Sequence, residues 1–122
     1  SQGVFDTYTL AKPEPAPTPA PGPTRVEFEN NTLRVPQAKL GDLQSVALKT
    51  AVDSVKDVQL DGDSGTIEGG VSSVKVKNSK LLEITLKGDL QSGSYQLSFK
   101  ALLPDKKTVV PGLLAVEVVG GQ

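Results

Sequence analysis

The chain has 122 residues and a formal net charge of −1, so it suits a single domain and offers no basic surface for nucleic acid. It contains no Cys and no His, which excludes disulfides, thiolate metal sites and the commonest metal ligand and general base. With three Phe, two Tyr and no Trp, its core must be built mainly from Val, Leu and Ile, a composition that favours strands.

The first twelve residues carry apolar side chains that a plain linker would not need. These are Val4, Phe5, Tyr8 and Leu10, and the stretch from position 7 to 10 alternates Thr with an apolar residue, as in a strand. We interpret residues 1–12 as a docking peptide that binds a partner. Two alternatives stay open: a frayed terminus with incidental aromatics, and a strand that folds back on its own domain.

A proline-rich spacer follows at residues 13–24, with proline at every second position from Pro13 to Pro23. Each ring fixes φ and removes a backbone donor, which predicts an extended polyproline II segment that cannot join a sheet. At about 3.1 Å per residue, the run from Pro13 to Pro23 spans roughly 34 Å. This spacer is long enough to hold the domain clear of whatever the docking peptide binds.

The sequence opens Ser1-Gln2-Gly3-Val4, without the charged and apolar regions of a signal peptide. Removal of an initiator Met before Ser1 and earlier cleavage of a signal peptide both explain this start. We favour the first, which implies a product of the cytoplasm. No apolar run reaches about 18 residues, so no insertion into a membrane is expected.

Residues 25–122 form the predicted domain. Apolar residues recur there in short runs separated by turn residues roughly every 8 to 12 positions, which is typical of a sandwich or barrel. Strands are predicted at 25–28, 32–35, 44–52, 58–60, 71–77, 81–87, 94–102 and 113–119. A single helical turn at 51–56 is an alternative for that segment, and the helix content should be small.

Four of these strands alternate clearly between apolar and polar residues, so each should turn one face to the core. The predicted inward residues are Val46, Leu48 and Val52; Leu82, Ile84 and Leu86; Tyr95, Leu97 and Phe99; and Leu114, Val116 and Val118.

The segment Leu90-Gln91-Ser92-Gly93-Ser94-Tyr95 resembles the tyrosine corner of immunoglobulin-like sandwiches. There a Leu precedes a tight turn at Gly, and a Tyr packs its ring in the core while its hydroxyl bonds the backbone upstream. Residues 95–118 likewise resemble the last two strands of bacterial and phage immunoglobulin-like domains. The resemblance implies an all-β, immunoglobulin-like antiparallel β-sandwich of Greek-key topology, carrying an extended proline-rich N-terminal arm. It implies no function, and Leu90, Gly93 and Tyr95 are its structural residues.

The acidic stretch at residues 61–65, with Glu68, is similar to a calcium-binding loop in composition only. An EF-hand loop that starts at Asp61 would need Gly at position 66 and Glu at 72, where the chain has Thr66 and Ser72. We interpret the stretch as a hairpin tip, because Asp and Gly are the residues of tight turns. No metal or other cofactor is expected.

Two further polar segments have simple structural explanations. Asn30-Asn31-Thr32 fits a glycosylation sequon, but equally a turn between two strands, which we favour. Asp105-Lys106-Lys107 is interpreted as a solvated hairpin loop, with contact to an acidic partner as the alternative.

No catalytic constellation is found, so the expected function is structural or binding rather than enzymatic. The leading hypothesis is a virion accessory or decoration protein of a tailed bacteriophage, assembled in the host cytoplasm. Its arm would dock to a capsid or other virion protein, and several arms acting together predict a homo-oligomer, of which a trimer is one form. The alternative is a secreted bacterial surface or adhesion module, extracellular or on the cell surface, that binds protein or carbohydrate. No nucleic acid partner is expected.

Overall fold

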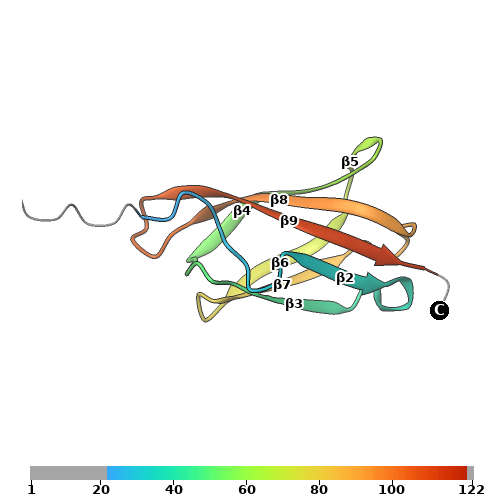
Figure 1. Ribbon diagram of the computed structural model, residues 1–122, viewed down its shortest axis with the longest axis horizontal. Helices are drawn as coiled ribbons and strands as arrows, with labels where there is room; N and C mark the ends of the chain where they lie inside the picture. The colour runs from blue at the N-terminus through green and yellow to red at the C-terminus, as the bar shows by residue number, and fades with distance from the viewer. Residues whose placement is uncertain (1–21, 121–122) are drawn as a thin grey trace, which may run out of the picture.

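The structure is a computed structural model that describes residues 22–120. Two β-sheets pack face to face, with strand orders β2-β9-β8-β4-β5 and β3-β7-β6 (Figure 1). The strands are β2 Thr32–Pro36, β3 Leu43–Ala47, β4 Ser54–Gly62, β5 Gly65–Ile67, β6 Val71–Lys77, β7 Leu81–Leu86, β8 Gly93–Leu102 and β9 Val109–Val119. One short 3-10 turn, η1 Gln37–Lys39, follows β2.

Every strand pair is antiparallel except β2–β9, which is parallel. Strand β4 crosses to the five-stranded sheet after β3, and β6 and β7 return to the other sheet before β8 and β9 complete the first. This is an immunoglobulin-like sandwich, as the sequence predicts. The fold class is confirmed, with one parallel pair that the alternation of residues does not reveal.

The core lies between the sheets and is aliphatic. All the predicted inward residues are buried except Tyr95, which is half-buried at the end of the sandwich. Two aromatic rings pack together toward the end where the arm begins: Phe28 meets Phe99 edge to face, with centroids 6.2 Å apart and planes at 88°. The Phe99 ring lies on Gly112 of β9, because a Cβ there would be 2.3 Å from the ring. Glycine is therefore required opposite Phe99.

Two predicted strands are wrong in extent, because the chain changes sheets within them. The segment 44–52 is a strand only to Ala47. Beyond it, the Val52 N–H donates to Ser79 O in the turn that joins β6 and β7 of the three-stranded sheet, and the Asp53 N–H donates to Leu102 O of β8 in the other sheet. Residues 25–28 are not a strand either. They make one isolated bridge, Phe28 with Leu48.

Other boundaries move outward. The predicted strand 58–60 is the centre of β4, which has a register shift near Asp57, where φ is +54°. Since β4 begins at Ser54, the helical alternative for 51–56 is wrong. Strand β5 is not predicted; it pairs with β4 around the two-residue turn Asp63-Ser64. Strand β9 begins at Val109 rather than at 113 and runs straight through Pro111.

A Gly112→Ala substitution should destabilise the fold by about 1–3 kcal/mol, the usual cost of overpacking a core. The added methyl group would enter the space that the Phe99 ring occupies. The change can be measured as a lower denaturant midpoint.

Gly88→Ala is the matched control. A Cβ at Gly88 meets no atom within 4 Å, so its midpoint should stay the same or rise slightly. Equal midpoints for the two variants would contradict the tight Phe99–Gly112 contact.

Candidate functional site

The segment before β2 joins both sheets at the end of the domain where the N-terminal arm begins. The Val26 N–H donates to Pro111 O of β9 at 2.9 Å, which ties it to the five-stranded sheet. One residue later, Glu27 O accepts the Lys49 N–H at 2.8 Å, beyond the end of β3. The chain then returns to β9 as β2. The root of the arm is thus hydrogen-bonded on both sides of the core.

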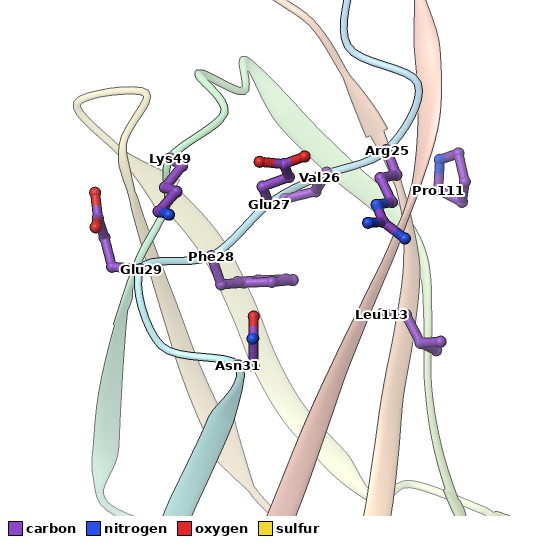
Figure 2. Close-up of a pocket in the computed structure, with 9 residues that line it drawn as sticks. All are labelled: Arg25, Val26, Glu27, Phe28, Glu29, Asn31, Lys49, Pro111 and Leu113. Atoms are coloured by element: carbon purple, nitrogen blue, oxygen red, sulfur yellow. The ribbon is translucent and has the colours of Figure 1, made fainter.

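This crossing leaves an open groove between the segment and β9, of about 660 Å³. Figure 2 shows Lys49 and Glu29 on one side and Arg25, Pro111 and Leu113 on the other, with the Phe28 ring pointing into the space between them. The lining residues are Arg25, Val26, Glu27, Phe28, Glu29, Asn31, Lys49, Pro111 and Leu113. The groove has an apolar floor and a charged rim.

The charges on that rim balance. Arg25 and Lys49 face a surface that also carries Glu27 and Glu29, and among residues 22–120 no ion pair joins any two of them. Such a rim selects neither anions nor cations. It suits contact with a mixed polar protein surface rather than capture of a small ion.

Beside the groove, β9 exposes an apolar stripe on the outer face of the five-stranded sheet. The stripe consists of Val109, Pro111, Leu113 and Ala115, four successive outward positions of one strand. Val109 is 47% exposed and Leu113 is 57% exposed. A strand with one face in water normally places polar residues at such positions. Sequence reasoning missed the stripe because it predicted that the strand begins at 113, which left Val109 and Pro111 outside the strand.

The predicted corner residues come together at the opposite end of the sandwich. Leu90 is buried, Gly93 begins β8 with φ of +149°, and the Tyr95 hydroxyl donates to Gln91 O at 2.6 Å. The ring differs from expectation in being half-buried. It lies against Gly62, where a Cβ would be 3.2 Å away, because the β4–β5 hairpin covers only one side of it.

The remaining polar segments are turns. The Asn30 side chain accepts the Thr32 N–H at 3.4 Å. Asp105 accepts the N–H groups of Lys107 and Thr108 at 2.8 and 2.9 Å. Lys106, with φ of +64°, pairs with Asp53 at 3.6 Å. The contacts of Asp105 and Lys106 hold the β8–β9 loop, next to the root of the arm (Figure 1).

The predicted docking residues Val4, Phe5, Tyr8 and Leu10 lie outside the described residues. In the part of the chain that the structure describes, no three His, Cys, Asp or Glu side chains gather as metal ligands. None of the helical segments in that part is long and apolar enough to cross a membrane.

No protein-family model matches the sequence, and no curated protein matches it. Solved structures do. CopC from Methylosinus trichosporium OB3b aligns with a TM-score of 0.55 and 15% identity, covering 80% of this chain and 97% of that one. Fibronectin(III)-like modules of Clostridium thermocellum CbhA align with a TM-score of 0.43 and 15% identity, covering 80% and 99%. At this identity the likeness to CopC shows the fold alone.

Tyr95→Phe should lower the free energy of unfolding by about 0.5–1.5 kcal/mol, because it removes one hydrogen bond and leaves Gln91 O without its donor. Chemical denaturation measures the difference. Tyr8→Phe, at the other tyrosine of the chain, is the control and should leave the midpoint unchanged. A Tyr95→Phe midpoint equal to that of the wild type would contradict a stabilising corner.

The contribution of the β8–β9 loop to the free energy of unfolding should depend on pH in the acidic range. Hydrogen bonds from the Thr108 hydroxyl, the Thr108 N–H and the Lys107 N–H hold the pKa of Asp105 below its ordinary value of 3.8. Since the unfolded state binds the proton more tightly, this contribution is present above about pH 3.8 and is lost as the pH falls through the lower, folded pKa.

Asp105→Asn should therefore flatten the fall in unfolding free energy between about pH 5 and pH 2.5. Asp63→Asn is the control, since among residues 22–120 no hydrogen bond or ion pair uses the Asp63 side chain. Identical acid slopes for wild type and Asp105→Asn would refute the prediction.

Proposed function

We propose that this protein is a non-catalytic binding module, held by its N-terminal arm and displaying its sandwich. The observation that carries the proposal is the double attachment of the arm's root. Val26 is hydrogen-bonded to Pro111 of β9, and Glu27 to Lys49 beyond the end of β3. A force applied through residue 24 is therefore distributed over both sheets. A tether that loads one edge strand alone could peel that strand away, whereas this root resists peeling.

The layout of the domain favours display. The described chain enters at the end that holds the β8–β9 loop, while β9 ends at the other (Figure 1). At about 3.3 Å per residue, the strand from Val109 to Val119 extends roughly 36 Å. In a single copy, the far end, with the Tyr95 corner and the β4–β5 turn, would stand away from that copy's own anchor.

The setting that we propose is the virion of a tailed bacteriophage, with the arm docked to a capsid or other virion protein. This rests on layout: a short sandwich without Cys, joined by a proline-rich spacer to a peptide with four apolar side chains. The docking residues would be Val4, Phe5, Tyr8 and Leu10. Ordering such a peptide costs about 1–2 kcal/mol per residue in backbone entropy, so one arm binds modestly and several together bind well.

The test uses the full chain with Phe5→Ser, Tyr8→Ser and Leu10→Ser, and a chain truncated to begin at Thr24. Both should melt as the wild type does and should lose most of their co-sedimentation with particles that lack this protein. Leu43→Ser is the control, because Leu43 is an exposed leucine of the sandwich; it should bind fully.

Full binding by the truncated chain would place the anchor on the sandwich and overturn the docking role of the arm. If the wild-type protein is found on bacterial cells and never on purified particles, the virion setting is wrong and the secreted surface module is favoured.

A further inference from the structure

The apolar stripe of β9 continues onto the neighbouring strand. Leu102 of β8 pairs with Val109 and is half-buried on the same outer face. The other sheet is different: its exposed Leu43 stands among Ser45, Thr85 and Ser73, which are polar. Contiguous exposed apolar surface on one face alone marks a place where another surface packs.

The edges of the sheets are protected against strand addition. Strand β2 is short and ends at Pro36, and β5 has three residues. Strand β3 has five residues, and at one end of it Ala47 O accepts the Glu29 N–H at 3.0 Å. Strand β6 carries a register shift near Ser73 and exposes Lys75 and Lys77. Short strands, proline, bulges and edge lysines all discourage pairing between sheets of different molecules. A partner is therefore expected on the face rather than at an edge.

The outer face is self-complementary. Its central row across three strands is Leu113, Ser98 and Gln59. The row on one side holds Pro111, Lys100 and Lys56, and the row on the other side holds Ala115, Gln96 and Asp61. Reversing the strand direction about the central row places Leu113 opposite Leu113, Pro111 opposite Ala115 and Lys56 opposite Asp61.

We propose that a second copy of this chain covers this face, related by a two-fold axis that runs across the strands at the level of Leu113. Leu113 then packs on the Leu113 of the other copy, and Pro111 on its Ala115. Lys56 lies opposite Asp61, and among residues 22–120 neither takes part in an ion pair. Symmetric contacts of this kind are the commonest in homodimers.

The remaining charges on the face are compatible with this contact. Arg34 already pairs with Glu117 at 2.9 Å, and Lys100 with Asp57 at 3.7 Å. Val109 of one copy lies opposite Glu117 of the other at the rim of the contact, where the Glu117 carboxylate stays paired with Arg34 of its own copy. No ion on the face is left opposite a like charge.

The size of the face suits a small interface. Strands β4, β8 and β9 are each roughly 30 to 36 Å long, but β2 and β5 are shorter, so with strands about 4.8 Å apart the area is roughly 600 Å², somewhat below the about 800 Å² per partner of a standard interface. The arms leave the two copies at opposite ends, so the dimer would carry two arms pointing apart. This inference does not depend on what the arms bind.

The first experiment measures the mass of the full chain by sedimentation velocity up to about 100 µM. The wild type should be a dimer and Leu113→Glu a monomer, because each copy would bury a carboxylate against another at the axis. Leu43→Glu is the matched control, since Leu43 is 55% exposed and Leu113 57%. It should remain a dimer.

The second experiment is a charge exchange. Lys56→Glu should weaken the dimer about five- to tenfold, because the contact occurs twice and becomes a pair of like charges. Adding Asp61→Lys to the same chain should restore the wild-type dissociation constant to within about twofold. Unchanged thermal melting of the variants confirms that they are folded.

Three results would overturn the inference: a wild type that stays monomeric over the whole range, equal effects of Leu113→Glu and Leu43→Glu, or no rescue by the double charge exchange. A dimer that is lost when residues 1–12 are deleted would also overturn it, since the occupant would then be the arm peptide. If the arm fails to bind particles, the masses measured by sedimentation are still those expected for the dimer. The two proposals can therefore be refuted independently of each other.

Discussion

The contact on which the sandwich depends is the ring of Phe99 lying over the backbone of Gly112, with Phe28 against its edge. The chain has no Trp, and in the described part of the core Phe28 and Phe99 are the only buried aromatic side chains. This cluster also joins three parts of the fold, because Phe99 and Gly112 belong to β8 and β9 while Phe28 comes from the segment at the root of the arm. Packing Phe28 there draws that segment into the gap between the sheets and fixes where the chain crosses.

That crossing explains both the groove and the exposed stripe. Between Val26 and Thr32 the chain leaves the edge of β9 to bond the end of β3, so Leu113 of β9 has no neighbouring strand on that side. Proline suits position 111 at the same edge because its nitrogen, which has no hydrogen to donate, faces away from β8. On that same side its carbonyl oxygen accepts the Val26 N–H. The charged rim of the groove is exposed to solvent, whereas the outer face of β9 is apolar.

Alternation in the sequence predicted the inward residues well and the ends of the strands poorly, for one physical reason. An alternation with a period of two tells which side chains face the core, but a strand of either sheet shows the same alternation. The pattern at residues 26–28 and 48–53 therefore does not show where the chain changes sheets. The last strand was predicted to begin at 113, after Pro111 and Gly112, although Gly112 lies within β9 and leaves room for the Phe99 ring. The predicted inward residues Leu114, Val116 and Val118 of β9 are buried, but Val109 and Pro111 of the exposed stripe lay outside the predicted strand. The docking peptide lies outside the described residues and stays a prediction.

The proposed dimer and the proposed arm bear on each other through avidity. One short peptide that orders on binding gives up backbone entropy of about 1–2 kcal/mol per residue, so a monomer would be held weakly. Two copies packed on their outer faces would send arms from opposite ends, each reaching roughly 34 Å beyond the domain. On a surface that repeats its binding sites, the second arm would then bind from a high local concentration. A stiff spacer serves this arrangement better than a flexible one, because the span between two fixed sites has to match its length.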